Sequence, residues 1–135
     1  MIEKLVMTRE HWAQILTEVE RVVPEEACGL LAGIDERVIE SIPVTNTLHS
    51  RVRFRMEPLE QLKAFQRIEA QGWDLIGIYH SHPLGQDGPS QTDIDEAYYP
   101  EVVSVIVSGR DGDWRCRGFH IWDGQTHEVP VLIED

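Results

Sequence analysis

Two histidines and a carboxylate lie close together in the stretch GIYHSHPLGQDGPSQTDIDEA, residues 77–97. His80 and His82 end an apolar run typical of a strand, in which residues i and i+2 point to the same side. Ten residues separate His82 from Asp93, and a loop of that length can bring the carboxylate back toward both imidazoles. Two imidazoles and one carboxylate leave the fourth position of a zinc ion open, as in catalytic zinc sites. The spacing therefore predicts a hydrolytic metal centre.

Such a centre also needs a base for the attacking water and a donor for the developing oxyanion. Glu26, in the otherwise apolar stretch EACGLL, is the candidate base, and Ser90, three residues before Asp93, is the candidate donor. Each feature has a simpler interpretation. Ser90 and Asp93 fit a helix capping box, Glu26 could be a solvated strand end, and an H-x-H pair alone is a weak signal among six histidines. Cys28 is interpreted as a small buried hydrophobe rather than a nucleophile.

The composition limits the class of protein. The chain has 24 acidic and 12 basic residues and a net charge of −12, which disfavours nucleic acid as a partner because phosphate contacts need a basic face. Its 135 residues predict a single domain over 1–135. No apolar run approaches the ~20 residues of a membrane helix, so no membrane contact is expected. The N-terminus MIEKLVMTREHW resembles no secretion signal, so we expect a cytoplasmic protein with Cys28 and Cys116 reduced.

Hydrophobic periodicity predicts the elements that must position these residues. A helix is expected over 8–23, with Thr8 as N-cap and Pro24 as stop, a second from Pro58 to Gly72, and a short one over 92–98. The run 102–108 is the most apolar and is expected to form a central strand. Turns are predicted at Asp111-Gly112 and Asp123-Gly124. The remaining strands are expected over 25–33, 37–46, 50–56, 74–79, 114–122 and 126–133. This order predicts an α/β (mixed) fold, a central mixed β-sheet flanked by helices.

Three segments taken together resemble the JAMM (MPN-plus, Mov34/PAD-1) metalloprotease family: Glu26-Ala27-Cys28-Gly29-Leu30-Leu31, His80-Ser81-His82-Pro83 and Ser90-Gln91-Thr92-Asp93. The family pattern is a glutamate, then H-[S/T]-H-P, then S-x-x-D, and the chain matches it at every motif position. The resemblance implies a cytidine-deaminase-like sandwich with one catalytic zinc ion on His80, His82 and Asp93. It also implies that Glu26 is the general base, which passes its proton to the leaving amine, and that Ser90 stabilises the oxyanion.

The resemblance also implies a substrate class. The family hydrolyses peptide or isopeptide bonds at the C-termini of ubiquitin and ubiquitin-like proteins, and this nearly bare domain is similar to the small bacterial and archaeal members. Those act on ThiS- or MoaD-like sulfur-carrier proteins or similar modifiers, so the bond could be a lysine isopeptide, a carrier–cysteine amide or a linear peptide. Two alternatives are an inactive MPN scaffold that has lost its metal and a non-haem iron oxygenase, which also uses two histidines and a carboxylate. The complete ligand set disfavours the first, and Glu26 and Ser90 fit hydrolysis better than the second.

Residues 50–56, SRVRFRM, alternate arginines with apolar side chains. On an edge strand, the outward arginines could contact the carboxylates of a carrier protein that adds to the sheet. They could instead protect the edge against aggregation, which is the interpretation we favour from the sequence. The arginines are Arg51, Arg53 and Arg55, and the inward residues are Val52, Phe54 and Met56.

Overall fold

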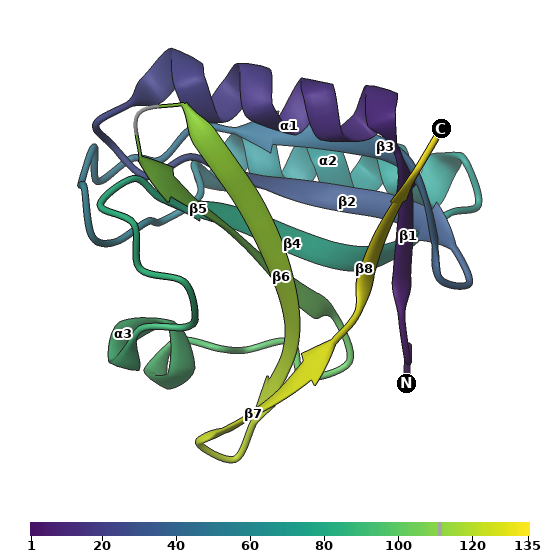
Figure 1. Cartoon of the computed structure of the whole chain (residues 1–135). Coiled ribbons are helices and arrows are strands. Elements are labelled where there is room, and N and C mark those ends of the chain that lie inside the picture. The colour runs from purple at the N-terminus through teal and green to yellow at the C-terminus, as the bar shows by residue number, and fades with distance from the viewer. Residues whose placement is uncertain (111) are drawn as a thin grey trace.

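A twisted sheet runs through the molecule, with helices packed against it (Figure 1). The computed structural model describes residues 1–110 and 112–135, so Asp111 of the predicted Asp111-Gly112 turn lies outside the described residues. Along the chain the elements are β1 (Leu5–Thr8), α1 (Arg9–Val22), β2 (Cys28–Ile34), β3 (Arg37–Val44), α2 (Pro58–Ala70), β4 (Asp74–His82), α3 (Gln91–Asp95), β5 (Val103–Arg110), β6 (Asp113–Trp122), β7 (Gln125–Val129) and β8 (Val131–Glu134).

The strands pair in the order β7-β6-β5-β4-β2-β3-β1-β8. β2 is antiparallel to β3 and β4, and β6 is antiparallel to β5 and β7. Parallel pairs join β4 to β5, and β1 to both β3 and β8. This mixed sheet with flanking helices confirms the fold class predicted from the sequence. β5, the strand expected to be central, is an interior strand beside the middle pair β4 and β2.

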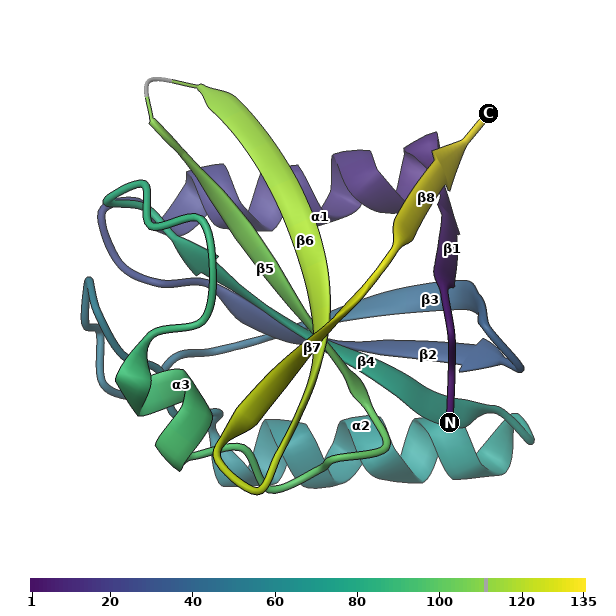
Figure 2. The same ribbon diagram turned by 60° about the horizontal axis from the view of Figure 1, so that its bottom comes forward.

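The two long helices cover opposite faces of the sheet (Figure 2). On β2, Leu31 packs in one cluster with Ile15 and Val19 of α1, whereas Leu30 packs in another with Ala64 of α2. Neighbouring residues of a strand point to opposite faces, so each helix buries a different set of β2 side chains. β4 alternates in the same way, because Tyr79 lies in the α1-side cluster and Ile78 packs on the α2 side.

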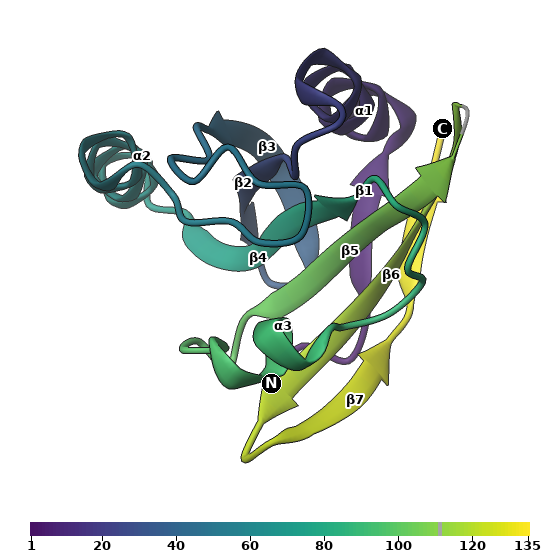
Figure 3. The ribbon, with the colours of Figure 1, turned by 90° about the vertical axis from the view of Figure 1, so that its left-hand side faces the viewer.

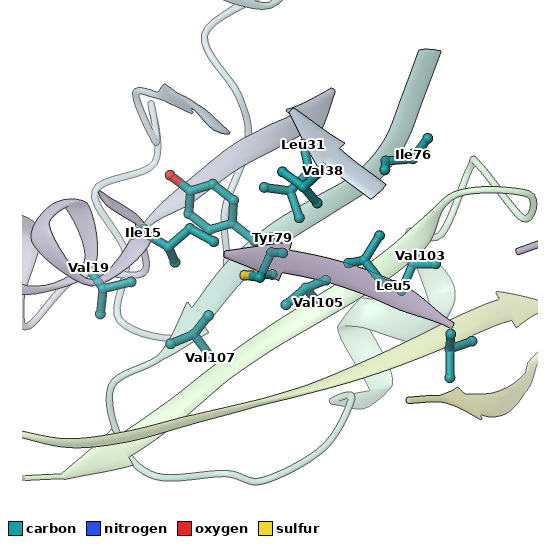
Figure 4. Close-up of a cluster of buried hydrophobic side chains, with 13 residues drawn as sticks. Leu5, Ile15, Val19, Leu31, Val38, Ile76, Tyr79, Val103, Val105 and Val107 are labelled. Carbon is teal, nitrogen blue, oxygen red and sulfur yellow. The ribbon is translucent and has the colours of Figure 1, made fainter. Parts of the chain in front are cut away.

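Helix α1 begins at the predicted cap. The Thr8 hydroxyl accepts a hydrogen bond from the His11 N–H at 3.2 Å, and the helix ends at Val22, before Pro24. Figure 4 shows Ile15 and Val19 among the buried side chains around Tyr79. Each such side chain, fully buried, contributes about 1.5–3 kcal/mol to stability. Within residues 1–110 and 112–135, no helix is both long enough and apolar enough to span a membrane.

The short helix α3 lies over β5 and β6, on the face that carries Ile106 (Figure 3). Ile94 of α3 and Ala97 beyond it pack against Ile106, Phe119 and Ile121 of β5 and β6. The helix spans Gln91–Asp95, slightly earlier than the predicted 92–98. Because Ile106 is paired with His80 in the parallel β4–β5 ladder, α3 sits above the face on which the β4 histidines project.

The ends of the sheet differ from the prediction in two ways. β1 was not predicted, because its four residues show no alternation of polar and apolar side chains and pair only with strands distant in sequence. The predicted strand 126–133 is divided at Pro130, which cannot donate a ladder hydrogen bond. Its first half, β7, is at one end of the strand order, and its second half, β8, pairs with β1 at the other end. Two strands that follow each other in sequence therefore lie at opposite ends of the order.

The prediction of a strand over residues 50–56 is wrong. These residues, all in the described part of the chain, form a loop in which Met56 alone makes an isolated bridge, to Asn46. Val52, expected to face inward, is 63% exposed, whereas Phe54 and Met56 do pack with the α2-side cluster. With no strand here there is no edge to protect or extend, so both interpretations of the arginines lose their premise. The loop nevertheless borders the site.

Candidate metal centre

The two histidines lie at the C-terminal end of β4, a strand paired on both sides. β4 continues past the predicted residue 79 and ends at His82, so both histidines belong to the strand. His80 is paired with Cys28 on β2 and with Ile106 on β5. Both imidazoles are buried, and the Phe54 ring stacks on His80 with centroids 4.8 Å apart. The interior of the sheet therefore fixes both imidazoles on one face.

Asp93 comes to the same point from α3. Its N–H donates to Ser90 Oγ at 3.0 Å, and the Ser90 N–H donates to Asp93 Oδ2 at 2.8 Å, so the predicted capping box is present. The same Oδ2 lies 3.1 Å from His80 Nε2 and 3.0 Å from His82 Nε2, and the two Nε2 atoms are 3.2 Å apart. The capping role and a ligand role are thus compatible, because the cap aims the carboxylate at the imidazoles.

This triangle of donor atoms fits a metal ion. A tetrahedral zinc ion with bonds of about 2.0–2.1 Å has ligand atoms about 3.3 Å apart. His82 Nδ1 lies 3.0 Å from the Gln86 carbonyl oxygen, which can only accept, so Nδ1 carries the proton in the neutral ring. In the neutral ring the lone pair is then on Nε2 and can bind a metal, whereas in the protonated ring Nε2 donates to Asp93. The residues present therefore suit a cation with mixed nitrogen and oxygen ligands.

The charges of the site favour a cation too. Burial opposes ionisation of Asp93, but hydrogen bonds from His80 and His82 outweigh it and hold the Asp93 pKa well below its ordinary value. Burial is the largest single influence on the pKa of His82 and lowers it, but Asp93, the Gln86 carbonyl and Glu26 together raise it, and the net result is a raised pKa. The site thus keeps a buried negative charge beside two imidazoles, and an ion bound there would be partly neutralised by it.

Glu26 completes the group from the residue pair that precedes β2. It is 2% exposed, which contradicts the interpretation of a solvated strand end. Its Oε2 lies 4.0 Å from His82 Nε2, and Oε1 has no hydrogen-bond partner among the described residues. Burial raises the Glu26 pKa to about 8, with a lowering effect of His82 and a further raising effect of Asp93. A buried carboxyl of this kind is suited to take up and release a proton near neutral pH.

Two ligand sets overlap at this site. Glu26, His80 and His82 each offer a donor atom within 4.8 Å of the others, an arrangement that could hold a metal ion. Asp93 forms the tighter set with the same two histidines. The structure thus brings together all the residues that the sequence singled out: the two histidines, Asp93, Ser90 at the cap and Glu26.

Three contributors were not identified from the sequence. Ser81, between the histidines, points away from them; its Oγ accepts from the Ala27 N–H at 2.8 Å, and its N–H donates to the Ala27 oxygen at 3.0 Å. It thereby joins the Glu26 segment to the histidine strand. Strand alternation could have predicted the direction of Ser81. Alternation predicted that Phe54 faces inward but not that it stacks on His80, and Gln86 lies in a loop with no periodic pattern. Cys28 is buried as predicted, and burial raises its thiol pKa to about 12.

A cavity of about 370 Å³ opens beside His80 and Asp93. Its floor is largely apolar, and an ion pair between Arg53 and Glu96 links its two walls. Arg55 also lines it, whereas Arg51 is exposed on the same loop. The lining residues are Arg53, Phe54, Arg55, Met56, Gln61, Ile78, His80, Thr92, Asp93, Glu96, Ala97, Tyr98, Tyr99, Val102, Ser104 and Ile121.

Known proteins of similar sequence include peptidases. The CysO-cysteine peptidase of Mycobacterium tuberculosis is 37% identical over 122 residues, which cover 88% of this chain and 84% of that protein. The desampylase of Haloferax volcanii is 37% identical over 115 residues, which cover 82% and 80%.

Solved structures share the fold. The solution structure of protein DSY2949 from Desulfitobacterium hafniense has a TM-score of 0.88 at 30% identity, over 97% of this chain and 93% of that chain. The crystal structure of AF2198, a JAB1/MPN domain protein from Archaeoglobus fulgidus, has a TM-score of 0.61 at 21% identity, over 97% and 100%, and shows a likeness of fold alone.

A match to a family model identifies the family of this chain. A family model described as prokaryotic homologs of the JAB domain matches residues 8–119. That span contains Glu26, the H-S-H-P segment and the S-x-x-D segment on which the JAMM resemblance was based. The resemblance is thereby confirmed, and this chain belongs to the prokaryotic JAB domain family.

Proposed function

We propose that this chain is a zinc-dependent peptidase that hydrolyses a peptide or isopeptide bond at the C-terminus of a ubiquitin-like or sulfur-carrier protein. One observation carries the proposal: a triangle of ligand atoms and a buried, unpartnered carboxyl group meet at the end of β4. The peptidases named above, similar over most of their length, support the reaction and the kind of substrate.

His80, His82 and Asp93 are the proposed ligands. Zinc held there with an open fourth position would lower the pKa of a bound water to about 7 and polarise the scissile carbonyl. We favour Asp93 over Glu26 as the third ligand because its oxygen is about 3 Å from both imidazole nitrogens, whereas that of Glu26 is 4.0 Å from His82.

The other two residues handle protons. The Glu26 carboxylate accepts a proton from the attacking water and passes it to the leaving nitrogen, because it is buried within reach of His82 and has no competing donor on Oε1 among the described residues. Ser90 Oγ accepts from the Asp93 N–H, so its own hydroxyl proton can be directed at the developing oxyanion.

The cavity beside Asp93 is the proposed seat of the substrate tail. Its apolar floor suits an extended peptide, and Arg53 and Arg55 at the rim suit an acidic carrier. Both cysteines are free thiols, in keeping with a reducing compartment, and a cytoplasmic site of action is part of the proposal.

The test is incubation of the zinc-reconstituted protein with the sulfur-carrier proteins of the same genome, each bearing a C-terminal adduct. Intact-mass measurement should show loss of the adduct by wild type and not by Glu26→Gln at equal zinc content. An inactive MPN scaffold would leave every carrier unchanged, and that result with a correctly loaded protein would overturn the proposal.

A further inference from the structure

The carboxyl group of Glu26 makes few contacts that could hold it in place. Oε1 has no hydrogen-bond partner in the described part of the chain, and Oε2 is 4.0 Å from His82 Nε2. The residue also lies outside the sheet ladder, whose β2 pairings begin at Cys28. The position of this carboxyl therefore depends on what holds the backbone of Glu26.

The backbone N–H and the backbone carbonyl of Glu26 are both hydrogen-bonded to the loop between β3 and α2, residues 45–57. The Glu26 N–H donates to the Ser50 oxygen at 2.7 Å, and its carbonyl oxygen accepts from Asn46 Nδ2 at 3.0 Å. The first bond joins two backbone groups, and the second comes from a side chain. Asn46 is thus the one residue of the loop whose side chain bonds directly to Glu26 among the described contacts.

The Asn46 amide uses all of its hydrogen-bonding capacity. Besides the Glu26 oxygen, Nδ2 donates to the Arg53 oxygen at 3.1 Å, and Oδ1 accepts from the N–H groups of Leu48 and Arg55, each at 3.1 Å. Two donors and two acceptor positions are what a carboxamide offers, so the group is saturated, and it is 8% exposed. A single buried side chain therefore ties Glu26 to the part of the loop that lines the cavity.

The same segment contacts the metal ligands and the cavity. Phe54, which follows the bonded Arg53, stacks on His80, and residues 53–56 line the cavity beside Asp93. Other bonds close the loop independently of Asn46: Thr47 Oγ1 donates to the Arg55 oxygen at 3.1 Å, and the Glu57 N–H donates to the Thr45 oxygen at 3.0 Å. These bonds add to those of Asn46, and among them only the bond from Asn46 Nδ2 reaches Glu26 from a side chain of the loop.

We infer that Asn46 is a positioning residue for the reaction, which sets the place of the Glu26 carboxyl relative to the histidines through the Glu26 backbone. The inference rests on the proposed function, in which Glu26 transfers the proton. A base displaced by a fraction of an ångström loses rate without losing the substrate or the metal. Asn46 thus acts through Glu26 and does not itself touch the reacting atoms.

The test compares Asn46→Asp and Asn46→Ser with Thr47→Val. Asn46→Asp keeps the shape and both acceptor bonds but removes the two donors, and Asn46→Ser removes the amide without adding charge. Thr47→Val deletes a side-chain bond within the same loop that does not reach Glu26. We expect kcat to fall about 10–100-fold in both Asn46 variants, with KM and bound zinc close to wild type. The thermal midpoint should fall as well, because buried carbonyl groups lose their partners. Thr47→Val should leave kcat unchanged.

A second measurement does not depend on turnover. The Glu26 amide donates to the Ser50 oxygen, and that bond is kept in the Asn46 variants. In the zinc-free protein this amide should nevertheless exchange with solvent about tenfold faster, because the segment opens more easily without the bond from Asn46 to the Glu26 carbonyl. The Ala27 amide, bonded to Ser81, should keep its protection. If one Asn46 variant fails to fold, the other decides the question.

Three results would overturn the inference: wild-type kcat in a folded Asn46 variant, an equal loss in Thr47→Val, or loss of zinc together with rate. The activities of wild type and of Glu26→Gln are measured in the same assay, so that a failure of the proposed function can be told from a failure of this inference. An inactive wild type refutes the proposed function, whereas an active wild type, an inactive Glu26→Gln and active Asn46 variants refute the role of Asn46 alone.

Discussion

The end of β4 and the loop over residues 45–57 meet at the same site but are built differently. β4 holds its histidines by ladder hydrogen bonds to β2 and β5, and its alternation directs His80 and His82 to one face. The loop has no ladder beyond one bridge and is held by side chains bonded to backbone, Asn46 above all. We conclude that the two histidine ligands are held by the sheet, whereas the position of the base and one wall of the cavity depend on the loop.

The largest expected effect comes from breaking the ligand set that joins β4 to α3. Asp93→Ala removes the oxygen about 3 Å from both imidazoles and should abolish both zinc binding and turnover. Zinc content by mass spectrometry and adduct cleavage measure the two losses. Asp95→Ala is the matched control, an exposed carboxylate on the same helix, and should keep both. Retention of a full equivalent of zinc in Asp93→Ala would assign the third ligand to Glu26.

Glu26→Gln separates the base from the ligands. The amide has nearly the same shape but cannot accept the proton, so kcat should fall about 10²–10⁴-fold while zinc content is unchanged. Glu25→Gln is the neighbouring control, because Glu25 pairs with His49 and does not face the histidines. Loss of zinc in Glu26→Gln would mean that Glu26 is a ligand.

Ser90→Ala tests whether the cap residue also serves the reaction. An oxyanion donor is worth about 10²–10³-fold in kcat, whereas loss of an N-cap costs about 1 kcal/mol of stability. We expect both the fall in kcat and a modest fall in thermal midpoint, with zinc retained. A fall in midpoint with kcat changed less than about threefold would leave Ser90 with the capping role alone.

The smallest expected effect concerns the loop arginines. Arg53 lines the cavity and pairs with Glu96, whereas Arg51 is exposed on the same loop outside the lining. Exposed charge pairs are worth up to about 1 kcal/mol, so Arg53→Ser should raise KM by up to about fivefold at low salt and flatten its salt dependence. Arg51→Ser is the control and should leave KM unchanged. Equal KM values for the two variants would remove the loop arginines from substrate recognition.

The sequence predicted the mixed sheet and the β4 histidines because periodicity is local. It could not predict β1, which pairs with strands far along the chain, or the division of the last strand between two ends of the sheet. Alternation in residues 50–56 indicated a strand, but the loop is determined by Asn46, whose bonds reach residues 7 to 20 positions away as well as its near neighbours. Side-chain to backbone bonds of this kind leave no periodic pattern.

The most direct test of the account is the location of zinc in crystals of the reconstituted protein, determined by anomalous diffraction at the zinc absorption edge. We predict one peak per chain, bonded to His80 Nε2, His82 Nε2 and Asp93 Oδ2, with the Glu26 carboxylate near the peak but not bonded to it. A peak bonded to Glu26 in place of Asp93, or no peak at this site after reconstitution, would contradict the account.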